Sequence, residues 1–391
     1  MEREELTAWL RLVLTPGVGS SNGRRLLAAF GVPHQVFAQS TTALQQVVTP
    51  TQAEALRRLP PELPALLEAT EAWLSADHEG LVGQLVTLGD AAYPKALLAT
   101  EDPPLMLHLL GPASLLGPAC SPLAWPTRAL AMVGSRNPTP QGRQDARQFA
   151  RAFGDAGICV VSGLALGVDG AAHEGALAAC DEAAEPSRLA TLAVIGTGID
   201  RVYPRQHRQL AHRIATQGLI VSEYPLGTPP LSANFPRRNR LIAGLTQGTL
   251  VVEAALQSGS LITARLATEQ GKEVFAIPGS IHSPQSRGCH ALIRQGAKLV
   301  ETAQDVLEEL RWPAALDSLL ADMDAAREGT PISDDHHAVL QALGGDPVGL
   351  DALLARTGLD TAALQARLLE LELDGRVGRL PGGLFQRLVR G

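Results

Sequence analysis

The stretch Ala129-Leu-Ala-Met-Val-Gly-Ser-Arg136 decides the fold of this 391-residue chain. Its five apolar residues end in a glycine, and a helical pattern follows at Gln141–Gly154. Continuous apolar runs are typical of strands that are buried on both faces of a parallel sheet. Because such runs alternate here with amphipathic helices, the sequence predicts a doubly wound, mostly parallel α/β sheet with helices on both faces.

The same pattern repeats as far as residue 300. Further strands are predicted at Ile158–Val161, Leu189–Ile195, Leu219–Val221, Thr249–Val252, Glu273–Ile277 and Lys298–Val300. Further helices are predicted at Gly170–Ala179, Arg205–Thr216, Leu261–Gln270 and His290–Arg294. In a sheet of this kind, ligands bind beyond the carboxyl ends of the strands. The loops at those ends are therefore the first place to look for a binding site.

The residues before this pattern have a different character. Residues 1–78 predict a small all-α domain of the SAM or helix-hairpin-helix type, with a break between two helices at Thr15-Pro-Gly-Val-Gly19. The amides of such a hairpin can meet a DNA phosphate, but a packing or protein-interaction role is slightly favoured, because glycine turns between helices are common. The Pro- and Gly-rich residues 79–125 predict a strand-bearing lead-in, so that 79–311 form one domain.

The residues after the pattern predict a linker at 312–335 and a winged-helix domain at 336–391. The linker is acidic and rich in small residues, and the domain combines three helices with a two-stranded wing. Its helices are predicted at His336–Leu343, Gly349–Arg356 and Asp360–Asp374. Because acidic side chains surround Arg367 on the third helix, contact with a protein is favoured over the reading of duplex DNA.

The composition limits the class of protein. The chain has 40 Asp and Glu residues against 33 Lys and Arg, and its net charge of −7 argues against a coat of nucleic acid but not against one basic groove. No C-x-x-C pair occurs, so buried thiols are expected rather than disulfides or zinc at Cys120, Cys159, Cys180 and Cys289. The acidic N-terminus is unlike a signal peptide, and no apolar run approaches the ~20 residues of a membrane span, so a cytoplasmic location is expected.

The segment Phe235-Pro-Arg-Arg-Asn-Arg240 is the most concentrated chemical signal in this acidic chain. Arginine forks bind phosphates in a bidentate way, and an aromatic ring offers a face on which a base can stack. The segment therefore predicts a polyanionic ligand that carries bases. The competing interpretation is a solvated helix start whose arginines pair with Glu223 or Glu253.

Six loops rich in small residues fall at the carboxyl ends of the predicted strands. One such loop is a weak signal, because any doubly wound domain needs small residues where a strand turns into a helix. Six on one rim favour a binding crevice. The loops are Gly134-Ser-Arg136, Ser162-Gly163 with Gly167-Val-Asp169, Gly196-Thr-Gly198, Ser222-Glu-Tyr224, Glu253 with Ser258-Gly-Ser260, and Pro278-Gly-Ser280.

The first of these loops is the sharpest signal. Backbone amides and a hydroxyl in Gly134-Ser-Arg136 can meet a phosphate at a helix N-terminus, and Arg136 adds a charged fork. The spacing is not G-x-G-x-x-G, and position 159 is a cysteine where a dinucleotide site has an acidic residue. A dinucleotide site is therefore disfavoured.

Three residues in the loops are candidates for catalysis. Asp169 and His173 are four residues apart on one predicted helix and could act as acid and base or bind a metal. A helix cap by Asp169 and a core hydrogen bond from His173 are the favoured interpretations. Glu253 could serve as a base, or it could cap the amides around residues 258–260.

Taken together, these motifs resemble those of the DNA-processing protein A family (DprA, also called Smf). Their order and spacing match from about Ala129 to Leu310, and the flanking helical and winged-helix regions agree less specifically. The motifs are the Gly134 turn, Ser162-Gly-Leu-Ala-Leu-Gly-Val-Asp169 with Ala172-His173, Ala193-Val-Ile-Gly-Thr-Gly-Ile-Asp200 with Tyr203-Pro204, Ser222-Glu-Tyr-Pro225, Phe235-Pro-Arg-Arg-Asn-Arg-Leu-Ile-Ala-Gly244, Val252-Glu-Ala254, Ser258-Gly-Ser-Leu-Ile-Thr-Ala264, Phe275-Ala-Ile-Pro-Gly279, and Leu292-Ile293 before Gly296-Ala297.

The resemblance implies a Rossmann-like domain and a non-enzymatic role, with no cofactor and no metal. Such proteins bind and protect single-stranded DNA and help load the RecA recombinase onto it during natural transformation. The resemblance also implies a homodimer through the Rossmann-like domain, and single-strand-binding protein as a further partner. The implied DNA contacts are Gly134, Ser135, Arg136, Ser162, Gly163, Phe235, Arg237, Arg238, Asn239, Arg240, Gly279 and Ser280.

One departure from the family and two other functions stay open. Where the family usually has Gly-x-Asn, this chain has Gly288-Cys-His290. The alternative function is a nucleotide-processing enzyme of the phosphoribohydrolase kind, which Gly248-Thr249 and Glu253 distantly resemble. The Pro-Gly-Gly-x-Gly-Thr loop of such enzymes is incomplete at Thr246-Gln-Gly-Thr249. A third possibility is a protein scaffold built on the terminal domains.

Overall fold

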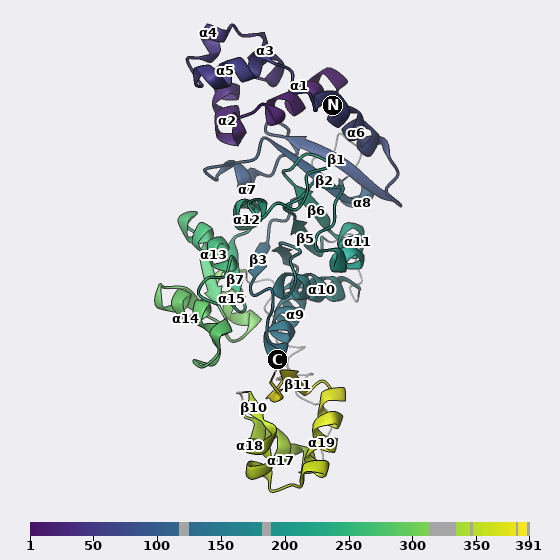
Figure 1. Cartoon of the computed structure of the whole chain (residues 1–391), viewed down its shortest axis with the longest axis vertical. Coiled ribbons are helices and arrows are strands. Elements are labelled where there is room, and N and C mark those ends of the chain that lie inside the picture. Colours follow the sequence, from purple (N-terminus) through teal and green to yellow (C-terminus); the bar gives the residue numbers. More distant parts are fainter. Residues whose placement is uncertain (117–124, 182–188, 313–333, 345–346, 381, 389–391) are drawn as a thin grey trace. The chain divides into compact units, whose positions relative to one another are not determined.

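The computed structural model describes residues 1–116, 125–181, 189–312, 334–344, 347–380 and 382–388. The chain divides into two compact units, Met1–Thr127 with Leu192–Leu245, and Arg128–Thr191 with Thr246–Gly391. The fold is mixed α/β with a large, mostly parallel sheet, as the sequence predicts (Figure 1). None of the described helices has the length and apolar character that a membrane span requires.

The first unit opens with six helices around an apolar core. They are α1 (Arg3–Leu14), α2 (Gly19–Phe30), α3 (Pro33–Ala38), α4 (Thr41–Leu44), α5 (Pro50–Arg57) and α6 (Leu63–Ser75). Leu10, Leu26 and Leu56 are completely buried in this core. The predicted break between the first two helices is a turn in which Gly17 and Gly19 have φ of +77° and +56°, a region that favours glycine.

The strands of the first unit lie in the order β1-β2-β6-β5. They are β1 (Leu81–Thr87), β2 (Met106–Pro112), β6 (Leu219–Ser222) and β5 (Thr191–Val194). β1 and β6 are each antiparallel to β2, and β5 is parallel to β6. The helices of this region are α7 (Lys95–Leu98), α8 (Ala113–Leu116), α11 (Arg208–Gln217) and α12 (Asn234–Gly244), with a 3-10 turn at Arg205–His207.

The second unit contains five parallel strands in the order β4-β3-β7-β8-β9. They are β4 (Cys159–Ser162), β3 (Ala129–Val133), β7 (Gly248–Val251), β8 (Glu273–Ala276) and β9 (Lys298–Leu299). β3 is completely buried except for a trace of Val133, which explains its unbroken apolar run. The helices are α9 (Pro140–Asp155), α10 (Val168–Asp181), α13 (Ser260–Glu269), α14 (Arg287–Arg294) and α15 (Ala303–Glu309).

The C-terminal residues form a small fold of their own, with three helices and a three-stranded antiparallel sheet in the order β10-β12-β11. Val339, Leu353 and Leu364 are completely buried in its core. Its elements are α17 (Asp334–Leu343), β10 (Val348–Gly349), α18 (Leu350–Thr357), α19 (Thr361–Leu373), β11 (Val377–Leu380) and β12 (Leu384–Arg387). This is the predicted winged-helix arrangement, with one short additional strand.

The strands and helices predicted between Ala129 and Val300 agree with the structure to within about three residues at each end. α12 begins at Asn234 and includes the segment Phe235–Arg240, for which a helix start is the competing interpretation in the sequence. Pro236 is tolerated because it lies in the first turn of the helix. Residues 313–333 of the predicted linker and Cys120 lie outside the described residues. Among the described residues, the thiols of Cys159 and Cys289 are buried and that of Cys180 is half-buried.

Candidate nucleic-acid interface

In the second unit, backbone hydrogen bonds fix the turn that follows β3 to two other segments. The Ser135 N–H donates to the carbonyl of Glu253 over 2.6 Å, and the Ser135 carbonyl accepts from the N–H of Val168 over 3.0 Å. A Cβ on Gly134 would lie 2.7 Å from a methyl carbon of Val168, so the close approach requires glycine. Ser135 is therefore buried with its backbone engaged, whereas Arg136 is exposed.

A protein carboxylate occupies the N-terminus of α9. Glu253 accepts hydrogen bonds from the N–H of Thr139 (2.9 Å) and from its hydroxyl (2.6 Å), while Thr139 caps α9 by accepting from the N–H of Gly142 (3.0 Å). Burial raises the pKa of Glu253, and the hydrogen bonds from Thr139 partly oppose this shift. Glu253 thus caps the start of α9 rather than the amides around residues 258–260. The N-terminus of α9, where the sequence predicts a phosphate, is therefore already capped by Thr139 and Glu253.

The other predicted contacts of the second unit follow β4 and β8. Ser162 is fully buried and donates its hydroxyl to the carbonyl of Met132 over 2.6 Å, and Gly163 beside it is also buried. Gly279 and the exposed Ser280 lie in the loop after β8. Because β3, β4 and β8 are parallel strands of one sheet, the loops that follow them lie at the same edge.

His290 has a defined contact in place of the family's usual asparagine. Its Nε2 hydrogen-bonds the carbonyl of Gly279 over 2.9 Å. The histidine therefore ties the loop after β8 to α14. This contact shows what the departure from Gly-x-Asn does in this chain.

The two residues considered as an acid–base pair have structural partners. Asp169 accepts a hydrogen bond from the N–H of Ala165 over 3.3 Å and lies in the first turn of α10. His173 is completely buried, and its Nδ1 lies 2.7 Å from the hydroxyl of Thr191, which itself donates to the carbonyl of Val160. The Nδ1 of His173 is therefore the donor to Thr191. The contact of His173 agrees with the favoured core hydrogen bond, whereas Asp169 holds the loop before α10 and is not shown to cap the helix.

The aromatic residue of the basic segment belongs to a ring pair in the first unit. Phe235 lies in the first turn of α12, and its ring centroid is 5.5 Å from that of Tyr203, with the planes tilted by 36°. Asn234 donates its side-chain amide to the carbonyl of Gly196 over 3.1 Å, which fixes the start of the helix after β5. Phe235 is half-buried and Tyr203 is 48% exposed. The pair therefore presents aromatic surface to solvent.

The three arginines of α12 have different environments. Arg238 is only 3% exposed and donates to the carbonyl of Val194 in β5. Arg240 pairs with Glu223 and also with Asp102, with 3.1 Å between its Nε and the carboxylate. Arg237 is exposed at the surface, and Asn239 is half-buried. The ion pair with Glu223, weighed as the competing interpretation of the segment, therefore holds for Arg240.

A group of arginines that sequence reasoning missed lies beside Tyr203. Arg201, Arg205 and Arg208 line a cavity of about 530 Å³ together with Tyr203. All three arginines are exposed, and Arg201 lies 3.7 Å from the carboxylate of Asp200 in a loose ion pair. The cavity therefore combines positive charge with the exposed aromatic ring, which are the two properties that single-stranded nucleic acid requires.

A sequence signal for this group exists. Arg205 and Arg208 stand at the beginning of the 3-10 turn and of α11, where the helix dipole favours negative charge. Neither side chain has a hydrogen bond or an ion pair in the part of the chain that the structure describes. Cations at a helix start do not stabilise the helix, which makes these arginines candidates for contact with an anionic ligand.

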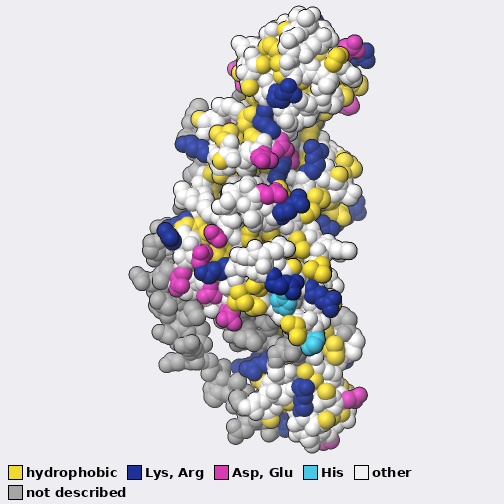
Figure 2. All heavy atoms as spheres, turned by 90° about the vertical axis from the view of Figure 1, so that its left-hand side faces the viewer, with side chains coloured by type: hydrophobic (Ala, Val, Ile, Leu, Met, Phe, Trp, Pro, Cys, Tyr) yellow, Lys and Arg dark blue, Asp and Glu magenta, His cyan; other side chains and the backbone are white. Residues whose placement is uncertain are grey.

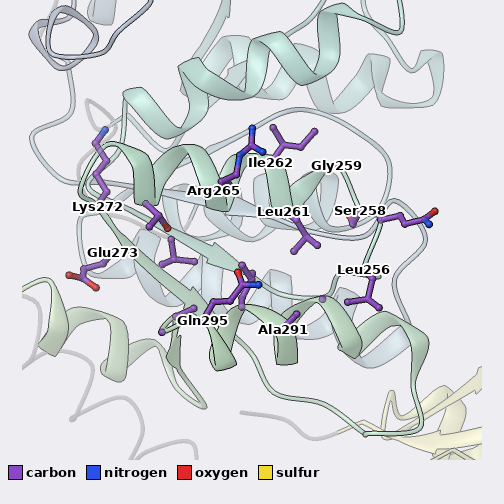
Figure 3. A pocket seen from close by; sticks show the side chains of 17 residues that line it. Leu256, Ser258, Gly259, Leu261, Ile262, Arg265, Lys272, Glu273, Ala291 and Gln295 are labelled. Atoms are coloured by element: carbon purple, nitrogen blue, oxygen red, sulfur yellow. The ribbon is translucent and has the colours of Figure 1, made fainter.

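A second cavity has a different character. It measures about 620 Å³ and is lined by residues of α13, α14 and β8 in the second unit (Figure 3). Leu261, Ile262 and Leu292 contribute apolar walls, and Arg265 and Lys272 add positive charge. Burial lowers the pKa of Lys272 to about 8. None of the predicted DNA contacts lines this cavity, so it is separate from the residues considered above.

The charge distribution agrees with local rather than general basicity. On the face that Figure 2 shows, Lys and Arg side chains are dispersed among apolar and acidic ones. With a net charge of −7, long-range attraction for a polyanion is weak. Affinity for a polyanion would therefore depend on a few clusters such as the one around Tyr203.

Comparisons with known proteins identify two regions of the chain. Residues 84–311 match the family model of DNA recombination-mediator protein A, and residues 323–383 match that of the DprA winged helix domain. Over 388 residues the chain is 36% identical to Protein Smf of Escherichia coli, which covers 98% of this chain and 96% of that protein. It is also 36% identical to the DNA processing protein DprA of Bacillus subtilis, over 69% of this chain and 85% of that protein.

A solved structure shows the same architecture. The X-ray structure of DNA processing protein A from Streptococcus pneumoniae superimposes with a TM-score of 0.63 at 32% sequence identity. The match covers 79% of this chain and 98% of that one. The likeness therefore includes nearly the whole of the solved chain.

Proposed function

Because this chain belongs to the DNA recombination-mediator protein A (DprA) family, we propose that it binds single-stranded DNA without regard to base sequence. In the cytoplasm it protects incoming DNA and helps load RecA during natural transformation. Its partners are RecA and single-strand-binding protein, and it acts as a homodimer through the Rossmann-like domain without catalysing a reaction. These finer roles rest on the family resemblance.

One observation carries the proposal for DNA binding: the exposed ring of Tyr203, which pairs with the half-buried ring of Phe235, lines a cavity together with three arginines. Each base has a π-face, so stacking on a ring does not depend on sequence and contributes ~1–3 kcal/mol per base. Arginine forks hold the phosphates between successive bases. A flexible single strand can place both groups in reach, whereas the bases of a duplex are stacked on one another.

The predicted contacts divide into two roles under this proposal. The exposed side chains Arg136, Arg237 and Ser280 are proposed to contact DNA directly, together with the half-buried Phe235 and Asn239 and the accessible backbone of Gly134 and Gly279. The buried Ser135, Ser162, Gly163 and Arg238 are proposed to hold the loops and α12 in place. Arg240 is proposed to act in the same way through its ion pairs.

The proposal is tested by fluorescence anisotropy with labelled single- and double-stranded oligonucleotides of about 16 nucleotides, which is enough for one site. The chain is expected to prefer the single strand, and the affinity is expected to fall with salt by a log–log slope of about 0.7 for each phosphate contacted. Arg136→Ala should weaken binding and reduce that slope. The matched control is Arg265→Ala, which removes an exposed arginine that lines the separate cavity.

Two results would contradict the proposal. The first is an absence of single-strand binding at low salt. The second is equal binding by single and double strands, which would indicate non-specific attraction. The enzymatic alternative is tested in parallel by the turnover of nucleoside monophosphates and its dependence on Glu253. Gly248 and Thr249, which resemble part of an enzyme loop, lie inside the buried strand β7, so the structure offers no support for that alternative.

A further inference from the structure

Residues 95–105 pack between the N-terminal helices and α12 within the first unit. On one side, a Cβ at Gly23 of α2 would lie 2.5 Å from a methyl carbon of Leu105. On the other side, a Cβ at Gly244 of α12 would lie 2.7 Å from a methyl carbon of Leu97. Both helices therefore pack closely against this segment.

A single carboxylate joins the two helices across this segment. Asp102 accepts from the Nη1 of Arg24 in α2 over 2.6 Å, and its second oxygen lies 3.1 Å from the Nε of Arg240 in α12. Arg24 also donates to the carbonyls of Pro103 (2.8 Å) and Glu101 (3.1 Å). The aspartate is thus fixed in place by a guanidinium that itself makes three contacts.

The bridge forms a balanced chain of charges. Arg24, Asp102, Arg240 and Glu223 alternate in sign, because Arg240 pairs with Glu223 as well. The side chains of the two arginines are only 19% and 17% exposed, so solvent screens these interactions less than it screens ion pairs at the surface. Without Asp102, the like-charged guanidinium groups of Arg24 and Arg240 would lose the carboxylate that they share. Glu223 would remain as a partner of Arg240.

The bridge ends on the helix that carries the proposed DNA contacts. Arg240 lies one helical turn after Arg237, so the anchoring of Arg240 fixes the rotation and the position of α12 at that point. A cavity of about 220 Å³ at the same corner is lined by Gly19 and Ser20 from the N-terminal helices and by Arg237 and Tyr224. Residues of the N-terminal helices and the exposed Arg237 thus line one cavity.

We propose that Asp102 is a positioning residue for the single-strand site. By joining Arg24 to Arg240, it holds α12 at the angle at which this helix presents its ring and its exposed arginine to DNA. The N-terminal helical region therefore sets the affinity of a site to which it need contribute no contact. This inference rests on the proposed function, because it describes how that site is kept in a competent conformation.

Simple electrostatics predicts the opposite effect for a change at this residue. Removal of a carboxylate near a polyanion site reduces repulsion and should strengthen binding. A positioning role instead lowers the fraction of molecules in which α12 is competent, and the apparent affinity falls by that fraction. The sign of the change in affinity therefore separates the two explanations.

The experiment measures single-strand binding of the full chain with Asp102→Asn, which keeps the shape of the side chain and removes its charge. The matched control is Glu101→Gln, which removes the neighbouring charge from an exposed side chain that has no ion pair among the described residues. We expect about three- to tenfold weaker binding for Asp102→Asn and unchanged or slightly tighter binding for Glu101→Gln. The salt slope should stay at the wild-type value, because the bound state keeps its phosphate contacts.

Two further measurements make the test specific. The double variant Arg24→Gln with Asp102→Asn should bind no more weakly than the weaker single variant, because both changes break one bridge. Without DNA, the amides of α12 should exchange hydrogen faster in Asp102→Asn than in Glu101→Gln. Additive losses or unchanged exchange in α12 would contradict the inference. A melting temperature well above that of the assay excludes unfolding as the cause of weaker binding.

The outcomes also separate this inference from the proposed function. If the wild-type chain fails to bind single strands, the proposed function falls, and the inference falls with it. If the wild-type chain binds and Asp102→Asn binds equally well or more tightly, only the positioning role is overturned.

Discussion

Neighbouring arginines of α12 differ in what surrounds them, although the sequence presents them as one cluster. Successive residues on a helix are separated by about 100° of rotation. Arg238 therefore points to the interior and donates to a backbone carbonyl, while Arg237 beside it reaches the surface. Two adjacent residues of the same type thus serve different purposes, and substitution of each should give a different result.

Arg237→Ala should weaken single-strand binding without a loss of stability. The side chain is exposed, so the free energy of unfolding should change by less than about 0.5 kcal/mol. If Arg237 contacts one phosphate, the salt slope of binding should fall by about 0.7. Anisotropy over a salt series checks the slope, and chemical denaturation checks stability. A slope equal to that of the wild-type chain would show that Arg237 contacts no phosphate.

Arg238→Ala should destabilise the chain by about 2–4 kcal/mol, because it removes a buried charged donor and leaves a cavity behind. The measurement is the free energy of unfolding in urea, with Arg237→Ala as the control of equal chemistry one residue away. Equal stability of the two variants would contradict the division of roles that the structure indicates.

Tyr203→Ala should weaken binding by about 1–3 kcal/mol, which is the value of one base–ring stack. Tyr203→Phe should bind like the wild-type chain, because stacking requires the ring and not the hydroxyl. Anisotropy with a single-stranded oligonucleotide checks both variants. Equal loss in the two variants would assign the effect to the hydroxyl and exclude stacking as its cause.

At the scale of elements, a buried histidine in β2 makes the stability of the sheet depend on pH. His108 of β2 lies opposite Ser222 of β6 and is completely buried. Burial lowers the pKa of His108 to about 4, and the neighbouring Ser222 and Asp200 oppose this shift. The histidine is therefore neutral in the folded chain at neutral pH, and its protonation is coupled to the opening of this part of the sheet.

His108→Leu should flatten the loss of stability on acidification. At a pH above the unfolded pKa of 6.5, His108 is neutral in both the folded and the unfolded chain, so its titration does not change the free energy of unfolding. As pH falls from 6.5 towards about 4, the unfolded chain binds a proton that the folded chain does not, which costs the wild-type chain up to about 3 kcal/mol. Urea unfolding at several pH values checks the difference between the two proteins. Parallel curves would contradict the coupling.

At the scale of the whole molecule, the predicted DNA contacts and the winged-helix region occupy different parts of the sequence, although a Cβ on Gly378 of β11 would lie 2.7 Å from Pro140 at the start of α9. The twelve residues predicted from the sequence, seven of which are proposed to contact DNA directly, all lie between residues 134 and 280, and the winged-helix fold begins at α17. In that fold, α19 exposes Leu369 and Leu373 and carries Glu370 and Glu372. An apolar and acidic helix suits contact with a protein better than contact with a phosphate backbone.

A chain that ends at Trp312 should keep its affinity for single strands to within about twofold, because it retains all the proposed contacts. The measurement is anisotropy against the full chain at the same salt concentration, and circular dichroism verifies that the shortened chain is folded. A loss of tenfold or more in a folded protein would show that the winged-helix region takes part in DNA binding.

The sequence by itself determined the class of fold and the loops at which a site could lie. Apolar runs, glycines and helical periodicity depend on near neighbours along the chain, so the strands from Ala129 onwards were predictable. The tertiary structure alone decided which side chains face solvent. Arg238 is buried because β5 offers it a carbonyl, and Glu253 caps α9 from more than a hundred residues away. Tyr203 and Phe235 form one surface only because the fold brings the loop after β5 and the start of α12 together. Such contacts leave no periodic trace in the sequence, because each partner comes from a different element.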